Sequence, residues 1–281
     1  MSLVVAFALL AAAPGAVVTR PVASMYSAPS TSSDVVSQAI FGTTVVLLKE
    51  KPGWARVRTP DDYMGWVGTA AFRKLRTGEE PYASAGTVAQ VESLFANVYV
   101  EPDVTTRAPL MTLPYEARVK VASEPEKDER RWVEVRLPGG SVAWVHRGDL
   151  TFERRPLTVQ AAVALAKRLL GLPYLWGGTS TFGYDCSGLT QMLYRRLGAG
   201  IPRDAGPQAQ WKGFTPVERT SLRPGDLLFF GKSAGKITHC GMYIGSGDFV
   251  HATTYRTPVV QISHLDEPHW STLLLSCRRP K

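Results

Sequence analysis

Cysteine is scarce in this chain of 281 residues: it occurs three times, as Cys186, Cys240 and Cys277. An odd number of cysteines without metal-ligand spacing predicts neither a disulfide framework nor a zinc site. Acidic residues are also fewer than basic ones, 24 against 32, which gives a formal charge of +8. The basic residues form no stripe interleaved with aromatic side chains, so we expect no nucleic-acid partner.

Long apolar runs are missing as well. The N-terminal run, residues 3–13, is shorter than the roughly 20 residues that a membrane-spanning helix needs, so we expect no stable membrane span. The run resembles the core of a signal peptide with alanine and glycine after it, although no lysine or arginine precedes it. We assign residues 1–16 to a leader segment and expect export, with a cytoplasmic protein as the alternative.

Cys186 stands at the start of a predicted helix. Apolar residues spaced three and four apart mark one helical face over residues 186–197: Leu189, Met192, Leu193 and Leu197. Asp185 is a good N-cap, and Gly198 is a good stop. In the first turn, free backbone N–H groups and the helix dipole favour a thiolate, whereas the Asp185 carboxylate opposes it. We therefore expect a partner imidazolium to be the main cause of thiol activation.

Two histidines follow on a predicted hairpin. Residues 237–244 and 249–254 are predicted to be strands joined through residues 245–247. Because side chains alternate between the faces of a strand, His239 and His251 share a face only if the loop has an odd number of residues or the hairpin contains a bulge. A three-residue loop with its last glycine in the left-handed conformation meets this condition.

A thiol with two imidazoles is the arrangement that acyl transfer through a thioester requires. The thiolate attacks a carbonyl, one imidazole carries the proton, and a second polar group orients that imidazole. A single cysteine or histidine is more often structural, but here order, spacing and faces agree. Cys240 is expected to face the core, away from both histidines, which argues against a metal site built from these residues.

An internal repeat marks the N-terminal half. The pattern W-x-x-V-R-x-P that starts at Trp54 returns 78 residues later at Trp132, and each copy is followed by a Trp-Val pair. The pattern Y-x-x-P at Tyr26 returns 73 residues later at Tyr99. Each copy has the size of a small barrel of short strands, and a short helix is expected within residues 83–96, at the start of the second.

Five stretches carry a resemblance over nearly all of residues 157–279: Pro173–Gly178, Tyr184–Gly188, Pro202–Asp204, Arg223–Phe230, and His239 through Ala252. In this order they resemble the NlpC-type papain-like cysteine peptidases of bacterial cell walls. The resemblance implies a small α+β unit, in which a helical part with the cysteine packs on an antiparallel sheet with the histidine.

The same resemblance implies the catalytic roles. Cys186 would be the nucleophile, His239 the general base, and His251 the residue that orients His239. Tyr174 would reach toward the cysteine and help to hold the oxyanion, with a core aromatic as the alternative. The resemblance implies no cofactor and no metal.

Both N-terminal copies resemble bacterial SH3 domains, and two of them before this catalytic part resemble γ-D-glutamyl-L-diamino acid endopeptidases. In that branch the first SH3 domain closes one end of the groove, and the free amine of an N-terminal L-alanine is recognised. The resemblance implies substrate contacts by Tyr63, Asp185, Ser187, Arg203 and Asp204, with Asp185 pairing with the amine. A helix cap, a solvated tyrosine and a surface Arg-Asp ion pair are the structural alternatives.

Two positions depart from the pattern of these relatives. An acidic residue of the first SH3 domain that also holds the amine falls near Ala28, so this contact is missing unless Asp61 or Asp62 substitutes. A serine that usually follows the Arg-Asp pair is replaced by Ala205. Both changes leave the specificity open without affecting the thiol chemistry.

We therefore predict a multidomain protein: two small all-β SH3-like barrels, residues 17–77 and 83–152, and an α+β papain-like domain, residues 157–281. The predicted function is that of a monomeric cysteine endopeptidase in the cell envelope or periplasm. It would cleave the γ-D-glutamyl bond to the diamino acid in peptidoglycan-derived peptides. The alternatives are a non-catalytic wall-binding protein, and a thiol amidase or acyltransferase on another wall component.

Overall fold

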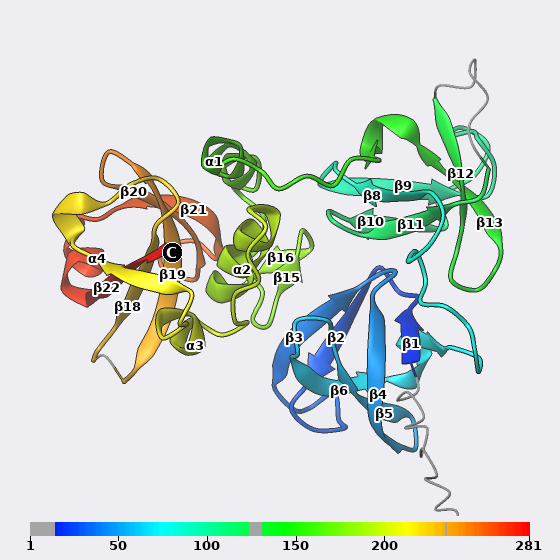
Figure 1. Ribbon diagram of the computed structural model, residues 1–281, viewed down its shortest axis with the longest axis horizontal. Coiled ribbons are helices and arrows are strands. Elements are labelled where there is room, and N and C mark those ends of the chain that lie inside the picture. Colours follow the sequence, from blue (N-terminus) through cyan, green and yellow to red (C-terminus); the bar gives the residue numbers. More distant parts are fainter. Residues whose placement is uncertain (1–14, 124–130, 234) are drawn as a thin grey trace, which may run out of the picture.

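The computed structural model describes residues 15–123, 131–233 and 235–281, which form three lobes (Figure 1). Our leader assignment falls mostly on residues 1–14, which lie outside the described residues. Its boundary shifts, because β1 begins at Gly15 and pairs with β4 and β7, two residues before the predicted start of the first domain. Within the described ranges, no helix is long and apolar enough to traverse a bilayer.

The first lobe is a seven-stranded antiparallel sheet in the order β3-β2-β6-β5-β4-β1-β7, curled around its own apolar core (Figure 1). Alternating residues of its short strands, such as Ala55 and Val57, are fully buried. Its elements are β1 (Gly15–Val18), β2 (Val22–Tyr26), β3 (Val35–Ile40), β4 (Thr44–Lys51), β5 (Trp54–Arg58), β6 (Met64–Gly68), the 3-10 helix η1 (Thr69–Ala71) and β7 (Phe72–Lys74).

The second lobe repeats this order strand for strand, as β10-β9-β13-β12-β11-β8-β14, so the internal repeat corresponds to a repeated topology. The helix expected within residues 83–96 is wrong. Ala89 and Val91 fill the core instead, and their strand pairs with β11 and β14. The elements are β8 (Val88–Val91), β9 (Phe95–Tyr99), β10 (Met111–Pro114), β11 (Arg118–Val121), β12 (Trp132–Arg136), β13 (Val142–His146), η2 (Arg147–Asp149) and β14 (Leu150–Thr151).

The third lobe combines helices with a six-stranded antiparallel sheet in the order β17-β22-β18-β19-β20-β21. Both faces of the sheet are covered, because Phe229 packs in the core with α2 whereas Phe230 packs in the core with Trp270 of α4. The elements are α1 (Val159–Arg168), β15 (Thr179–Ser180), β16 (Gly183–Tyr184), α2 (Cys186–Arg196), α3 (Ala205–Ala209), β17 (Phe214–Val217), η3 (Arg219–Ser221), β18 (Leu227–Gly231), β19 (Ile237–Gly245), β20 (Asp248–Thr253), β21 (Val259–His264), α4 (Pro268–Leu273) and β22 (Leu274–Pro280).

The predicted hairpin of β19 and β20 contains a bulge. The register shifts between Tyr243 and Gly245, which leaves Ile244 as the additional residue. The loop is then only Ser246 and Gly247, both with positive φ, 54° and 84°, as two-residue hairpin turns favour. The bulge rather than a three-residue loop therefore brings both histidines to the same face.

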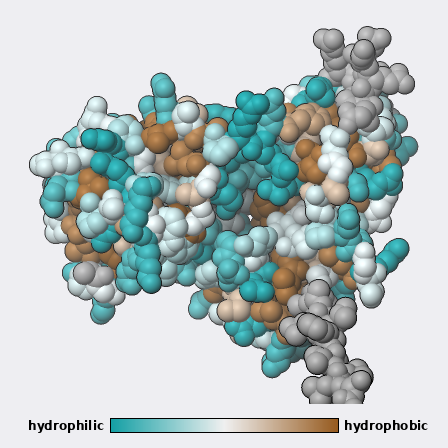
Figure 2. Space-filling model, viewed as in Figure 1, coloured by the Kyte–Doolittle hydropathy of each residue, from teal (hydrophilic) through white to brown (hydrophobic). Residues whose placement is uncertain are grey.

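The first lobe packs on the turn that precedes the nucleophile helix. Gly177 in this turn has φ +75°, and a Cβ added there would lie 2.7 Å from Cγ1 of Val35. Beside it, the Gln38 side-chain oxygen accepts hydrogen bonds from the Thr179 backbone at 3.0 Å and from the Ser180 hydroxyl at 3.1 Å. In the view of Figure 2, apolar residues are scattered over all three lobes rather than collected on one of them.

We expect Gly177→Ala to lower the thermal unfolding midpoint more than Gly53→Ala. Both glycines have nearly the same φ, +75° and +74°, so both variants carry the left-handed strain of about 1–2 kcal/mol. Only Gly177 lies against Val35, whereas nothing lies within 4 Å of a Cβ at Gly53. Circular dichroism melts of both variants measure the difference, and equal shifts would contradict the close packing of this turn.

Candidate active site

Cys186 is the first residue of α2 and is 8% exposed. A hydrogen bond from the thiol of Cys240 and a second one with His239 hold the pKa of Cys186 well below its usual range, against the opposing effect of burial. The Cys240 backbone also hydrogen-bonds this sulfur. The sequence predicted an imidazolium as the main cause of activation; His239 acts here through both a hydrogen bond and its charge, and the neighbouring thiol is a contributor that the sequence did not predict.

Cys240 faces the α2 side of β19, as predicted, and its sulfur meets polar groups there. The Thr190 hydroxyl lies 3.5 Å away, and Oε1 of Gln208 lies 3.7 Å away. Burial and the hydrogen bond to Cys186 raise the pKa of Cys240 well above its usual range, so its proton stays in place. An ionised sulfur is a stronger acceptor than an amide oxygen, so this proton is directed to Cys186 once that thiol ionises.

A chain of hydrogen bonds runs from His239 into the core. Its Nε2 lies 2.8 Å from Nδ1 of His251, and Nε2 of His251 lies 3.1 Å from the hydroxyl of Ser263. Burial, followed by the charge of His239, holds the pKa of His251 well below its usual range, so this ring stays neutral. A neutral ring has one donor and one acceptor. Protonated His239 therefore donates to His251, which donates to Ser263, and Nδ1 of His239 is left for Cys186.

Trp270 of α4 covers this chain of imidazoles. Its ring stacks on His239, with centroids 5.1 Å apart and an interplanar angle of 28°, and meets His251 edge-on at 4.7 Å. Trp270 is 2% exposed, so the histidine pair is separated from solvent on this side. A hydrogen bond between two imidazoles is stronger in such a dry setting than in water.

Tyr174 lies half-buried near the nucleophile. Burial, followed by the negative charge of Cys186, raises the pKa of Tyr174, so the phenol keeps its proton. It is therefore available as a hydrogen-bond donor beside the sulfur. Its part in holding an oxyanion stays a prediction.

Asp185 and Arg203 form a buried, bidentate ion pair. The two oxygen–nitrogen distances are 2.6 and 3.0 Å, and the side chains are 9% and 1% exposed. Asp185 also accepts from the backbone N–H groups of Gly177 at 2.9 Å and Gly188 at 2.7 Å. Burial raises the pKa of Asp185, and the Arg203 guanidinium opposes that shift. The alternative of a surface ion pair with the neighbouring Asp204 is wrong, because Arg203 is paired with Asp185.

Ser187 and Ser37 complete this polar network. The Ser187 hydroxyl donates to Asp185 at 3.2 Å and accepts from Arg203 at 2.9 Å. Nε of Arg203 donates to the hydroxyl of Ser37, a residue of β3, at 3.2 Å. The network thus joins the first lobe to the start of α2.

Tyr63 of the first lobe reaches Asp204 of the third. Its hydroxyl donates to the Asp204 carboxylate at 3.1 Å, so this tyrosine is not a freely solvated side chain. Burial, followed by the charge of Asp204, raises the pKa of Tyr63 to about 12. The structure therefore brings together two residues that lie 141 positions apart in the sequence.

The two acids proposed to replace the missing contact near Ala28 have other partners. Asp61 accepts a hydrogen bond from Gln191 of α2 at 3.0 Å, and Asp62 pairs with Arg58 at 3.2 Å. Neither has an observed contact with Asp185 or with the Tyr63–Asp204 pair. The missing acid thus has no observed substitute among the described residues.

Sequence reasoning missed Ser263, Trp270, Gln208 and the contact between the two cysteines. Only Ser263 had a local signal, since it is a polar residue on a strand that follows the histidine hairpin. The other contacts arise where separate elements meet. In the part of the chain that the structure describes, no group of three or more histidine, cysteine or acidic side chains is arranged to hold a metal ion.

Comparisons with known proteins agree with this arrangement. Residues 171–279 match the NlpC/P60 family, and residues 25–72 match the bacterial dipeptidyl-peptidase Sh3 domain. The SH3 label of the second lobe stays a prediction that rests on the strand order it shares with the first.

Two curated relatives and one crystal structure extend over most of the chain. A γ-D-glutamyl-L-lysine dipeptidyl-peptidase from Bacillus cereus is 32% identical, over 86% of this chain and 74% of that protein. Dipeptidyl-peptidase 6 from Lysinibacillus sphaericus is 29% identical, over 90% and 93%. The crystal structure of an NlpC/P60 family protein from Bacillus cereus has a TM-score of 0.82 at 26% identity, and covers 95% of this chain and 99% of that one.

We expect Cys240→Ala to raise the pKa of Cys186, because the variant removes a hydrogen bond to its sulfur. The rate of alkylation by iodoacetamide, measured against pH, would then rise at a higher pH than in the wild type. Cys240→Ser keeps a donor and should lie closer to the wild type. Cys277→Ala removes a buried thiol from the other core and should change nothing. An unshifted profile in Cys240→Ala would contradict the assigned effect.

Proposed function

Since this chain belongs to the NlpC/P60 family of cysteine peptidases, we propose that it hydrolyses the γ-D-glutamyl bond to the diamino acid in peptidoglycan stem peptides with a free N-terminal L-alanine. The observation that carries this proposal is that Tyr63 of the first lobe donates to Asp204, the chain neighbour of Arg203, which pairs with Asp185 at the start of the Cys186 helix. The activity given in the name of the Bacillus cereus relative supports the same bond.

Cys186 begins the reaction as a thiolate. It attacks the γ-carbonyl carbon of D-glutamate, and the carbonyl oxygen becomes an oxyanion. When this intermediate collapses, the bond to the diamino acid breaks, and His239 gives its proton to the leaving amine. A dipeptidyl thioester remains on Cys186. Water, deprotonated by His239, then frees L-Ala-γ-D-Glu and restores the thiolate.

His251 acts through His239 as a positioning residue. Its neutral ring accepts the Nε2 proton of His239 at 2.8 Å, which fixes the ring plane and keeps Nδ1 directed to the sulfur. Ser263 holds the tautomer of His251 in turn. An aspartate at position 251 would add a full negative charge beside the imidazolium, whereas a neutral ring adds orientation and no charge.

Backbone and phenol donors would stabilise the oxyanion. The first N–H groups of a helix have no partners within the helix, and Cys186 is the first residue of α2. The protonated Tyr174 beside the sulfur adds a side-chain donor. Each such donor contributes in proportion to how well it is fixed before the reaction.

The balance of charges favours a substrate amine at Asp204. We predicted Asp185 as the partner of the amine, but both of its oxygens already have donors, chiefly Arg203. Asp204 has only the Tyr63 hydroxyl as an observed side-chain partner among the described residues. With Asp185 neutralised by Arg203, the charge of Asp204 is uncompensated, and an ammonium group would restore neutrality.

This arrangement explains how the site would reject substrates whose N-terminal amine is blocked. An acetylated or sugar-linked alanine has no charge to offer, so Asp204 would lose water without gaining a partner. Unpaired polar groups in a site discriminate more strongly than a missing methylene does. Stem peptides that are already trimmed would therefore be preferred.

The wild-type protein is expected to convert L-Ala-γ-D-Glu-L-Lys into L-Ala-γ-D-Glu and lysine, whereas Cys186→Ala should lose at least a thousandfold in kcat, because the nucleophile is gone. Mass spectrometry of the products measures both rates and also separates this peptidase from an amidase or an acyltransferase. Equal turnover by the two proteins would end the catalytic assignment.

We expect Asp204→Asn to raise the KM for this tripeptide at least tenfold, because the amine loses its counter-charge. The preference for the free over the N-acetylated tripeptide should narrow by a similar factor. The rate of Cys186 alkylation should not change, which separates binding from thiol activation. Asp62→Asn, at an exposed aspartate of the Tyr63 loop, is the matched control. A full preference retained in Asp204→Asn would overturn the role of this carboxylate.

A further inference from the structure

Two of the three cysteines lie together where α2 packs on the sheet. Cys186 begins α2, Cys240 lies on β19, and both belong to the core between the helix and the sheet. The Thr190 hydroxyl lies 3.5 Å from the sulfur of Cys240 and 3.3 Å from the backbone oxygen of Cys186. The sulfur of Cys240 is therefore held at the first turn of α2, where it hydrogen-bonds the sulfur of Cys186. Both residues are free thiols.

The two sulfurs differ in how readily an oxidant reaches and attacks them. Cys186 is 8% exposed, whereas Cys240 is 0% exposed. Hydrogen bonds with Cys240 and His239 hold the pKa of Cys186 well below its usual range, and burial raises the pKa of Cys240. Oxidants react with exposed thiolates much faster than with buried thiols. Oxidation therefore begins at Cys186, while Cys240 stays a reduced thiol in hydrogen-bond contact with it.

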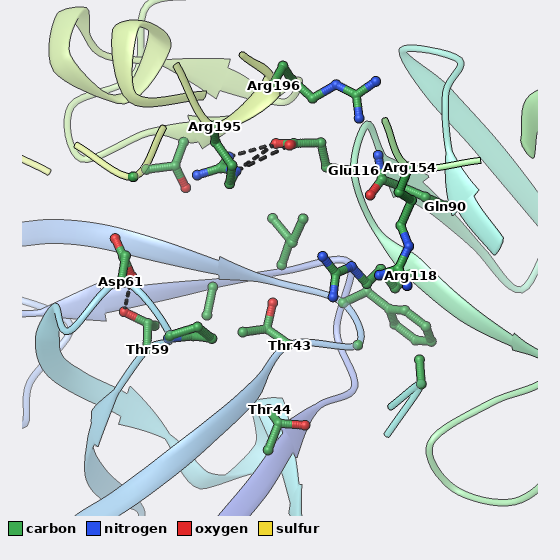
Figure 3. A pocket seen from close by; sticks show the side chains of 18 of the residues that line it. Thr43, Thr44, Thr59, Asp61, Gln90, Glu116, Arg118, Arg154, Arg195 and Arg196 are labelled. Carbon is green, nitrogen blue, oxygen red and sulfur yellow. Dashed lines mark hydrogen bonds and ion pairs between the residues drawn. The ribbon is translucent and has the colours of Figure 1, made fainter. Parts of the chain in front are cut away.

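Neither the third cysteine nor the cavity between the lobes leads to this pair. Cys277 packs with Trp270 in the core on the other face of the sheet. Figure 3 shows the cavity, of about 840 Å³, at the far end of α2, where Arg195 and Arg196 lie. Its lining contains neither of the paired cysteines. A small oxidant therefore meets the sulfur of Cys186 at its own exposed surface, as the substrate carbonyl would.

We propose that Cys186 and Cys240 are joined in a reversible disulfide when the protein meets hydrogen peroxide. The thiolate of Cys186 attacks one peroxide oxygen, the O–O bond breaks, and the leaving hydroxide takes a proton to become water. Cys186 is then a sulfenic acid. The sulfur of Cys240 attacks this sulfur, its proton leaves with the sulfenic oxygen as water, and the S–S bond forms. The two thiols lose two electrons, which the peroxide gains.

Such a disulfide would stop hydrolysis and protect the nucleophile at the same time. The thiolate is lost while its sulfur is bound to Cys240, and exchange with an external thiol restores it. Without Cys240, a second peroxide would convert the sulfenic acid into a sulfinic acid, which thiols do not reduce. The effect on turnover rests on the proposed function, whereas the disulfide itself needs only the two thiols.

Mass spectrometry of the full chain after treatment with hydrogen peroxide tests this proposal. The remaining thiols are alkylated in denaturant, and the peptides are analysed without reduction. We expect the wild type to lose two hydrogen atoms, to give one cross-linked peptide pair that contains Cys186 and Cys240, and to be alkylated only at Cys277. Turnover of L-Ala-γ-D-Glu-L-Lys should fall by about tenfold or more, because the nucleophile is bound, and dithiothreitol should restore it.

Cys240→Ser removes the second sulfur of the pair. This variant should give no cross-link and should accumulate a sulfinic acid on Cys186. Dithiothreitol should leave its turnover low, relative to the rate of the same variant before treatment. Cys277→Ala is the matched control from the other core and should behave like the wild type. Cys240→Ala should repeat the result of Cys240→Ser, and melting curves before treatment show that each variant is folded.

Two results would overturn the proposal. One is a sulfinic acid on Cys186 of the wild type without the cross-link. The other is recovery of Cys240→Ser by dithiothreitol to the same extent as the wild type. Failure of the proposed function looks different, because the untreated wild type would then leave the tripeptide intact although the cross-link still forms.

Discussion

The carboxylate of Asp185 holds together the parts on which the active site depends. It caps α2 through Gly188, accepts from Gly177 in the turn beneath the first lobe, and forms a buried ion pair with Arg203. Arg203 in turn reaches Ser37 of the first lobe. One side chain thus fixes the nucleophile's helix, the preceding turn and the neighbouring lobe. Removing one member of such a pair typically costs about 3–5 kcal/mol, because the other charge stays buried without compensation.

The two carboxylates near the start of α2, Asp185 and Asp204, have different partners. Asp185 is paired with Arg203 and caps α2, whereas Asp204 forms no ion pair among the described residues and accepts from Tyr63 of another lobe. Two hydrogen-bond partners, the thiol of Cys240 and the imidazole of His239, stabilise the thiolate of Cys186 although Asp185 precedes it in the chain. A carboxylate next to a thiolate ordinarily opposes its ionisation, and the positive charge of Arg203, which is paired with Asp185, counters that effect.

The sequence predicted those features that are set by local periodicity. Spacing and an N-cap gave the helix that starts at Cys186, and strand alternation put both histidines on one face, although a bulge at Ile244 rather than the loop achieved this. The internal repeat gave two alike lobes. Contacts between elements escaped prediction: Cys240 was assigned to the core correctly, but that side of the sheet also holds Cys186. Arg203 and Asp185 lie 18 positions apart, so their pairing depends on how the chain folds back between them. No local sequence pattern indicates this.

The helix α2 carries opposite charges at its two ends. Its N-terminal end, where the dipole is positive, carries the thiolate of Cys186, and its C-terminal end, where the dipole is negative, carries Arg195 and Arg196. Each charge is therefore placed where the helix itself favours it. The first lobe makes two contacts with this part of the third lobe, from Tyr63 to Asp204 and from Asp61 to Gln191 of α2. Because these two residues lie on the same short loop between β5 and β6, a shift of this lobe against α2 would alter both contacts together.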